Sequence, residues 1–197
     1  ASLLGYKKEL LVAAENIDNL EVFSKEIGRL FLTPTYLLDS FYEVTLSNSN
    51  PILHTGRIYS MWKDWRGECY YENPLFYHDW TDEASEILLK MDEEFFELLK
   101  FLNVNTKHLL PLLQHYEVSD AFTLTTKLKS ISSFSTIKSP MKQVSNGWIP
   151  DLTSRYFTED FNYGLRFIYD LAHQNNISCP TIDKVYEWGI TLINKSL

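Results

Sequence analysis

The sequence predicts a mainly α-helical protein, in which a bundle-like helical C-terminal domain follows a small α/β segment at the N-terminus. Three observations predict this class. Apolar residues recur at helical spacing through the long segment 81–102. Segments typical of strands fall mainly within residues 1–45. Hydrophobic residues make up 45% and aromatic residues 15% of the 197 residues, which is enough for a sizeable core.

The first part of the chain has a strand–helix–strand character. The apolar run 10–14 is bounded by charged residues and predicts a short buried strand. Residues 19–31 predict a helix, because Asn19 is a suitable N-cap and apolar residues follow it at helical spacing. That stripe comprises Leu20, Phe23, Ile27 and Leu30. Residues 35–46 are rich in aromatic and β-branched residues, which favours a strand or an extended segment.

From about residue 46 onward the sequence predicts four to six helices. The clearest covers 81–102, where Thr81 can cap the helix and the two acids that follow suit its positive end. Its apolar stripe comprises Ala84, Leu88, Met91, Phe95, Leu98 and Leu102. A second helix is expected over 106–118, with Pro111 forcing a start or a kink.

The last third of the chain predicts three more helices and a loop. Residues 120–131 are typical of a shorter helix, and residues 138–152 hold two prolines and a glycine, which indicates a loop. A helix is then expected from about Thr158 to Gln174. Pro180 marks the region where the closing helix begins.

Composition excludes several classes of protein. The net charge of −8 argues against a nucleic-acid or anionic-membrane partner, because no basic surface is available to bind phosphates. Cys69 and Cys179 lie far apart without CxxC spacing, which favours a reduced setting, although a single disulfide stays open. No apolar run approaches the roughly 20 residues that a membrane span needs. We therefore expect a soluble, cytoplasmic protein.

Several catalytic motifs are missing from the sequence. It contains no GxGxxG or GxxxxGK[ST] loop for phosphates, no GxSxG elbow and no HExxH zinc motif. His108 and His115 lie two helical turns apart in the second expected helix, too far apart for one metal ion. We expect no metal site, and both histidines to be surface or core residues.

His54 has a more promising context. The stretch "NSNPILHTG" predicts an irregular, tightly turned backbone, on which a histidine can present its ring to a cleft. Histidine titrates near neutrality and is the commonest general acid–base. The alternative is a ring that only binds a loop carbonyl, and spacing does not choose between the two.

The stretch "SRYFTEDF" places a cation beside two acids. Thr158 as N-cap, with Glu159 and Asp160 in the first turn, is ordinary chemistry for a helix start. That explanation does not cover Arg155, whose planar guanidinium suits a carboxylate held by two hydrogen bonds. An ion pair between Arg155 and its own neighbours explains it equally well, and both interpretations stay open.

Taken in order, these segments resemble the octopine/nopaline (opine) dehydrogenase family. The resemblance runs through "SNSNPILHTG", "NPLFYHDWTDEASEILLKMDEEFFELL", Ser139–Pro140, "SRYFTEDF" with Gly164, and "NISCPTID", and it covers most of residues 46–190. Members of that family join an amino acid to a 2-oxo acid by reductive amination with NAD(P)H. They have an N-terminal Rossmann domain and a C-terminal helical domain, with the substrate between them.

The resemblance implies a role for three residues. His54 matches the catalytic histidine, and Asp160, the last acid of the R-Y-x-x-E-D motif, matches its aspartate partner. Arg155 matches the ligand of the substrate carboxylate, and Glu159 keeps the capping role. We therefore expect His54 and Asp160 within about 2.6–3.2 Å of each other, with Arg155 facing the same cleft. One departure is His54-Thr55 where the family often has His-Pro, which alters the stiffness of the backbone.

The resemblance also implies an incomplete protein. The glycine-rich nucleotide loop is missing, so residues 1–45 correspond to the last strand–helix–strand of a truncated nucleotide-binding domain and residues 46–197 to the helical substrate domain. NAD or NADP would be bound mainly by the missing part, and the isolated chain would be inactive. The expected substrates are an amino acid and a 2-oxo acid. The resemblance does not decide whether the protein is an oligomer. The alternatives are a non-catalytic helical interaction or dimerisation module and a related dehydrogenase for another small acid.

Overall fold

The computed structural model describes residues 8–195, which form two compact units. The described residues of the first unit are 8–48 and 103–109, and those of the second are 49–102 and 110–195. The mainly helical class predicted from the sequence is confirmed. No helix among residues 8–195 is long and apolar enough to cross a membrane.

The first unit contains the expected strand–helix–strand. Strand β1 (Leu10–Val12) pairs in parallel with β2 (Thr35–Leu37), and α1 (Leu20–Phe31) connects them. Asn19 caps α1 as expected, because its side chain accepts a hydrogen bond from the backbone N–H of Val22 at 3.0 Å.

The strand or extended segment predicted over residues 35–46 is only partly present. Only Thr35–Leu37 of the segment 35–46 is a strand, and Phe41–Leu46 forms helix α2. The side chain of Ser40 accepts from the backbone N–H of Glu43 at 3.3 Å, which starts the helix. A good cap therefore outweighs the strand preference of the aromatic residues that follow it.

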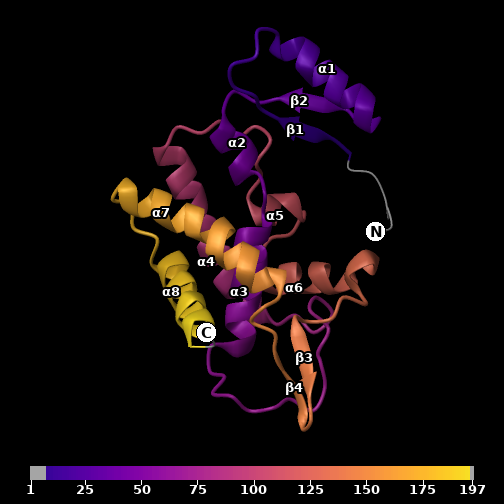
Figure 1. Cartoon of the computed structure of the whole chain (residues 1–197), viewed down its shortest axis with the longest axis vertical. Helices are drawn as coiled ribbons and strands as arrows, with labels where there is room; N and C mark the ends of the chain where they lie inside the picture. Colours follow the sequence, from indigo (N-terminus) through magenta and orange to yellow (C-terminus); the bar gives the residue numbers. More distant parts are fainter. Residues whose placement is uncertain (1–7, 196–197) are drawn as a thin grey trace. The chain divides into compact units, whose positions relative to one another are not determined.

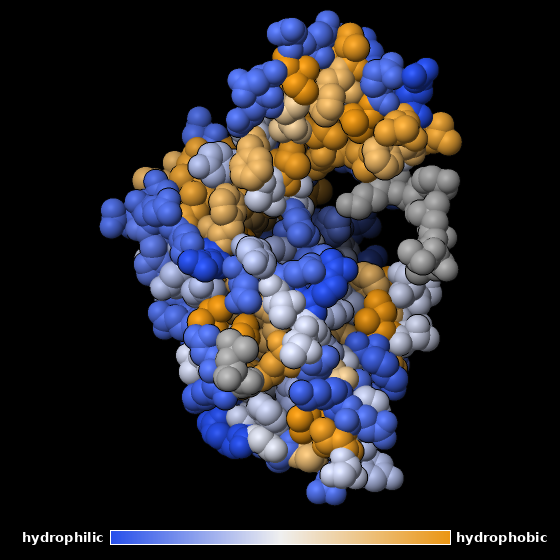
Figure 2. Space-filling view, viewed as in Figure 1, coloured by the Kyte–Doolittle hydropathy of each residue, from blue (hydrophilic) through white to orange (hydrophobic). Residues whose placement is uncertain are grey.

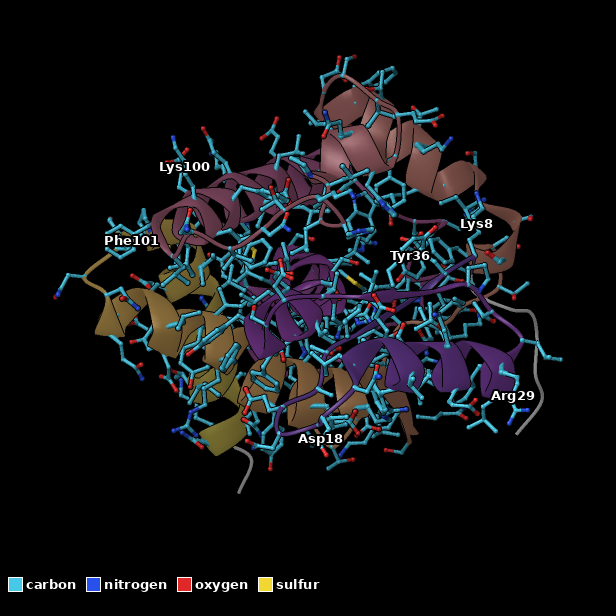
Figure 3. The ribbon with its side chains drawn as sticks, turned by 90° about the horizontal axis from the view of Figure 1, so that it is seen from above. Lys8, Asp18, Arg29, Tyr36, Lys100 and Phe101 are labelled. Atoms are coloured by element: carbon cyan, nitrogen blue, oxygen red, sulfur yellow. The ribbon has the colours of Figure 1, made fainter. Side chains whose placement is uncertain are left out.

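The surface of the first unit is unusually apolar. Val22, Leu30, Phe31, Leu32 and Tyr36 are all exposed. Figure 2 shows apolar side chains gathered over α1 and the neighbouring sheet. Polar residues interrupt this surface at the outer side of α1, where Arg29 (Figure 3) binds Glu26 at 3.0 Å.

The second unit is built around α3 (Asn50–Trp62), which packs against three other elements (Figure 1). These are α4 (Asp82–Phe101), the π-helix η2 (Tyr156–Leu165) and α8 (Pro180–Asn194). The fully buried side chains of this core include Ile58, Trp62, Leu88, Met91, Leu98, Phe157, Phe161 and Val185. Helix α8 begins at Pro180, as expected.

Helix α4 agrees with its prediction. Oγ1 of Thr81 accepts from the backbone N–H of Ala84 at 3.2 Å, and this bond caps the helix. The buried residues of the predicted stripe are Ala84, Leu88, Met91, Phe95 and Leu98. Leu102 lies at the C-cap and is only partly buried.

Two other expectations for the second unit need correction. The helix expected over 106–118 is reduced to α5 (Leu112–His115), with Pro111 as its N-cap. The residue before a proline is biased away from helical geometry, which keeps the preceding residues out of the helix. The loop expected over 138–152 contains the hairpin β3 (Met141–Val144) and β4 (Gly147–Pro150). Its prolines lie at strand ends, where a missing N–H costs little. Strands are therefore not confined to the first part of the chain.

The remaining helices follow the expected order. Helix α6 (Ala121–Ser130) is followed by a 3-10 turn, η1 (Ser132–Phe134). The helix expected from about Thr158 begins instead at Tyr156 as η2 and continues as α7 (Arg166–Gln174). Thr158 is not its N-cap: its hydroxyl donates to the carbonyl of Ser154 at 3.2 Å. Thr158, which was assigned as the N-cap from its residue type, therefore lies within the helix.

Candidate active site

His54 lies on helix α3 and not on a loop, which corrects the sequence-based expectation. Pro51 occupies the first turn of α3, where its fixed φ angle and missing N–H suit a helix start. The asparagine and proline that indicated an irregular backbone therefore open a helix. As a result, His54 is carried by a rigid core element.

The structure brings His54 and Asp160 together. Nδ1 of His54 lies 2.8 Å from Oδ2 of Asp160, and both side chains are largely buried. An ionised carboxylate only accepts hydrogen bonds, so this contact places a proton on Nδ1. Nε2 is then the ring nitrogen that is left to exchange a proton with another group.

Asp160 lies on the π-helix η2, which packs against the helix that carries His54. The i→i+5 hydrogen bonds of η2 widen the backbone, a feature that is frequent at functional sites. Gly164 lets η2 lie directly against α3, because a Cβ at this position would come within 2.7 Å of the Pro51 ring. Tyr156, four residues before Asp160, packs its ring 4.7 Å from that of His54.

A second polar group meets His54 from the opposite side. The hydroxyl of Tyr77 lies 3.2 Å from Nε2 of His54, and the Phe76 ring packs edge-on at 5.8 Å. Burial raises the pKa of Tyr77 above its ordinary value, and neighbouring Tyr156, Tyr116 and Asp160 add to the increase. Burial, with Asp160, also raises the pKa of Tyr156. Both phenols are therefore neutral hydroxyls at ordinary pH.

Sequence reasoning did not identify Tyr77 as a candidate. It lies in "NPLFYHDW", which carried only the family resemblance. The available signal was the density of aromatic residues in that stretch, because a buried tyrosine usually finds a hydrogen-bond partner for its hydroxyl.

Arg155 is bound to a neighbour on its own helix. Nε and Nη2 of Arg155 donate to the two carboxylate oxygens of Glu159 at 2.9 and 2.8 Å, and the arginine side chain is 84% exposed. The local ion pair that the sequence left open is thus present. The bond to Glu159 raises the pKa of Arg155, and Asp160 contributes a smaller electrostatic share. Arg155 therefore lies within electrostatic reach of the His54–Asp160 pair without binding it.

The two acids of "SRYFTEDF" do more than occupy the first turn. Glu159 lies in the first turn of η2, as expected, but its carboxylate binds Arg155 and this bond lowers its pKa. Asp160 binds His54. Neither acid caps the helix, because both carboxylates are engaged with side chains.

His108 and His115, which were expected to be surface or core residues, belong to different units. His108 belongs to the first unit, where its ring packs 5.2 Å from that of Tyr36. His115 lies in α5 with its ring edge-on to Tyr116. The helix expected to carry both does not exist. In residues 8–195, no three His, Cys, Asp or Glu side chains are grouped so that they could hold a metal ion.

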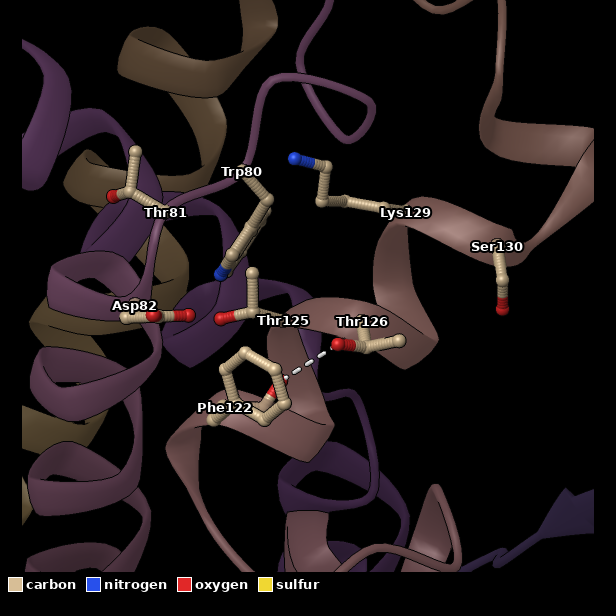
Figure 4. Close-up of a pocket in the computed structure, with 8 residues that line it drawn as sticks. All are labelled: Trp80, Thr81, Asp82, Phe122, Thr125, Thr126, Lys129 and Ser130. Carbon is tan, nitrogen blue, oxygen red and sulfur yellow. Dashed lines mark hydrogen bonds between the residues drawn. The ribbon is translucent and has the colours of Figure 1, made fainter.

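A separate hollow of about 510 Å³ lies between the start of α4 and helix α6 (Figure 4). It is lined by Trp80, Thr81, Asp82, Phe122, Thr125, Thr126, Lys129 and Ser130. Three of its lining residues form hydrogen bonds: Trp80 donates to Ser85, Ser85 shares a bond with Thr125, and Thr126 donates to the carbonyl of Phe122. This hollow contains no histidine, so the candidate active site is the group around His54.

Comparison with known proteins identifies opine dehydrogenases among the relatives of this chain. The model of the family described as NAD/NADP octopine/nopaline dehydrogenase, alpha-helical domain, matches residues 37–193. Tauropine dehydrogenase from Arabella iricolor is 28% identical over 158 residues, which are 74% of this chain and 40% of that protein. Opine dehydrogenase from Haliotis discus hannai is 27% identical over 192 residues, which are 91% of this chain and 47% of that protein.

Solved structures show the same fold. Octopine dehydrogenase with NADH and L-arginine aligns with a TM-score of 0.77 at 22% identity and covers 98% of this chain and 51% of its own. Its complex with NADH and pyruvate gives a TM-score of 0.75 at 23% identity, covering 95% and 48%. The chain thus spans about half the length of the proteins that it matches.

Proposed function

The chain belongs to the octopine/nopaline dehydrogenase family through its alpha-helical domain, and we propose that it is the substrate-binding and acid–base part of an opine-type dehydrogenase. Such an enzyme joins an amino acid to a 2-oxo acid by reductive condensation with NADH or NADPH. The observation that carries this proposal is the 2.8 Å contact between His54 and Asp160 on two packed helices. The complexes of octopine dehydrogenase with L-arginine and with pyruvate support this pair of substrate classes.

In this proposal, protonated His54 acts as the general acid. The amino group of one substrate attacks the carbonyl carbon of the other, and the carbonyl oxygen takes a proton from Nε2 of His54. The neutral His54 ring then takes a proton from the attacking nitrogen and passes it to the same oxygen, which leaves as water and gives the protonated imine. Asp160 fixes the ring through Nδ1 and stabilises its positive charge. Proton transfer of this kind typically contributes about 10²–10⁴-fold to the rate.

Arg155 is proposed to hold the carboxylate of the 2-oxo acid. Its two donors already bind a carboxylate, that of Glu159, in the paired geometry that an oxo acid would need. A substrate would exchange one carboxylate for another on an exposed side chain. The exchange costs little, because ion pairs at an exposed surface contribute little to stability.

The described residues do not fit the phosphate end of a nicotinamide cofactor. A dinucleotide needs a glycine turn at a helix N-terminus, and α1 begins instead with Asn19, whose side chain occupies the first turn. We therefore propose that NAD or NADP is bound mainly by an N-terminal nucleotide-binding domain outside these 197 residues. The division between residues 1–45 and residues 46–197 stays part of this proposal. The compact units support its boundary, because they separate between residues 48 and 49, although residues 103–109 also belong to the first unit.

The test uses the full-length enzyme that contains this domain. Oxidation of NADH and NADPH is followed with pyruvate and a panel of amino acids, and the product is identified by mass spectrometry. We expect oxidation that requires both an amino acid and a 2-oxo acid. A protein that oxidises neither cofactor with any such pair contradicts the proposed function.

A further inference from the structure

Tyr77 meets the nitrogen of His54 that has to give up the proton. With Asp160 at Nδ1, the exchangeable position of the ring is Nε2, and the Tyr77 hydroxyl lies 3.2 Å from it. A hydroxyl can donate to the lone pair of the neutral ring and can accept from the N–H of the charged ring. Tyr77 can therefore form a hydrogen bond with both the neutral and the charged ring of His54.

The ring of Tyr77 is held firmly. It stacks on Phe134 with ring centres 4.1 Å apart, and on Trp80 at 5.8 Å with nearly parallel planes. Phe76 meets it edge-on at 5.0 Å. Only 5% of Tyr77 is exposed. A buried ring packed on several sides keeps its hydroxyl in one place, because the surrounding core leaves little room for another rotamer.

Arg57 holds the backbone on both sides of Tyr77. It lies on α3, three residues after His54, and is 3% exposed. Its Nε donates to the carbonyl of Phe76 at 3.1 Å and its Nη2 to the carbonyl of Asp79 at 2.7 Å. The helix that carries His54 therefore also fixes the segment that carries Tyr77.

Arg57 keeps its positive charge although it is buried. Desolvation lowers the pKa of Arg57 to about 10, which leaves the guanidinium charged at neutral pH. The guanidinium also lies over the Trp80 ring, 5.2 Å from its centre. The same Trp80 ring stacks on Tyr77, so one cation stabilises both the backbone and the aromatic packing around the hydroxyl.

We propose that Tyr77 is a positioning residue that holds the imidazole ring of His54 through Nε2 until the carbonyl oxygen of the substrate replaces the Tyr77 hydroxyl at that nitrogen. This inference rests on the proposed function, in which His54 is the acid. Asp160 and Tyr77 bind opposite ends of one imidazole ring, so a rotation of the ring by half a turn breaks both bonds. Without Tyr77, only the Asp160 bond fixes the orientation of the ring before the substrate binds.

The central variant is Tyr77→Phe, which removes the hydroxyl and keeps the stacked ring. In the full-length enzyme we expect kcat to fall about 10–100-fold with little change in KM, because misaligned transfer affects the transition state more than substrate binding. Tyr59→Phe is the matched control: it removes a hydroxyl from a buried tyrosine on α3 that packs against Trp188. We expect that control to retain the normal kcat.

A second measurement does not depend on catalysis. The ¹⁵N chemical shift of Nε2 in His54, recorded on the 197-residue chain, reports the hydrogen bond at that nitrogen. We expect Tyr77→Phe to move this resonance toward that of a free imidazole nitrogen while Tyr59→Phe leaves it in place. Phe134→Leu, which keeps the hydroxyl and removes the stacking, should broaden the resonance and lower kcat less than Tyr77→Phe.

The outcomes separate the two proposals. An unchanged ¹⁵N shift together with a normal kcat in Tyr77→Phe overturns the role of Tyr77, and loss of activity in His54→Ala then leaves the proposed function standing. Normal activity in His54→Ala contradicts the proposed function itself. In that case the role of Tyr77 in proton transfer falls with it, and the shift reports only whether the bond exists.

Discussion

Nδ1 of His54 and Oδ2 of Asp160 lie 2.8 Å apart although 106 residues separate them in the chain. The bond joins two elements of the core, α3 and η2, and is largely shielded from solvent. A hydrogen bond between charged partners is stronger in such surroundings than at a surface. Loss of this bond should therefore affect the activity of the enzyme.

Replacement of either partner should affect kcat more than KM. In the full-length enzyme we expect His54→Ala to lower kcat by about 10²–10⁴-fold, because it removes the proton donor used in the transition state. Asp160→Asn should cause a smaller loss, since an amide cannot stabilise the charged ring. Steady-state kinetics measure both effects, and melting curves must first show that both variants fold.

Loss of Arg155 should weaken binding of the 2-oxo acid, and loss of the Glu159 carboxylate should not. Arg155→Ala should raise the KM for the 2-oxo acid, and Arg155→Lys should restore little, because an ammonium group lacks the paired donors. Glu159→Gln removes the carboxylate that now occupies Arg155, so it should lower that KM or leave it unchanged. A rise of KM in Glu159→Gln equal to that in Arg155→Ala shows that the ion pair is structural.

The isolated chain should not bind a dinucleotide tightly. It has no glycine turn for the pyrophosphate, and the first turn of α1 is already capped by Asn19. Calorimetry of the 197-residue chain with NADH should show no binding at micromolar concentrations. The full-length enzyme serves as the positive control, and micromolar affinity in the chain alone contradicts the proposed division of roles.

Asp92 should make the protein less stable as the pH rises. Burial raises its pKa to about 6, although the backbone N–H of Leu112 donates to it at 2.9 Å and opposes the shift. Because the folded pKa lies above the unfolded value, the stabilising contribution of the carboxyl is fully present only below about pH 4, and it is lost as the pH rises through about 6.

Asp92→Asn tests this effect, because its amide oxygen can still accept from Leu112. We expect the variant to gain on the order of 2–3 kcal/mol over the wild type between pH 4 and pH 8, measured by urea unfolding. The other carboxyls titrate equally in the wild type and in Asp92→Asn, so their effects cancel in the difference between the two unfolding free energies. A difference that does not depend on pH would falsify the assignment to Asp92.

Glu94 should stabilise α8 from a neighbouring helix. Its carboxylate accepts from the backbone N–H of Thr181 at 2.8 and 3.0 Å and from that of Ile182 at 2.9 Å. This arrangement satisfies donors at the start of α8, where Pro180 offers no N–H. Glu94→Ala should therefore cost about 0.5–2 kcal/mol in the free energy of unfolding. Its exposed neighbour Glu93, changed to Ala, should have little effect.

The sequence alone was sufficient where structure depends on local chemistry. The caps Asn19 and Thr81 and the start of α8 at Pro180 were all predicted, because each depends on neighbours within a few residues. The stripe of α4 was predicted for the same reason, since helical spacing shows directly which face is buried.

Local signals failed where two of them competed. Asn50 and Pro51 are found both in turns and at helix starts, and only the packing of α3 into the core shows that His54 lies on a helix. The same ambiguity applies to residues 138–152, where prolines that suggested a loop flank a hairpin. Neighbouring residues give equal support to both alternatives in such segments.

The partners of His54 were decided by the tertiary structure. The pairing with Asp160 was expected from the family resemblance, and no spacing within the chain implies it. The bond to Tyr77 was not expected at all, and the choice of Glu159 as the partner of Arg155 was left open. A sequence determines which side chains can bind one another. Which of them meet depends on how α3, η2 and the aromatic segment pack, because packing alone sets distances between residues that are far apart in the chain.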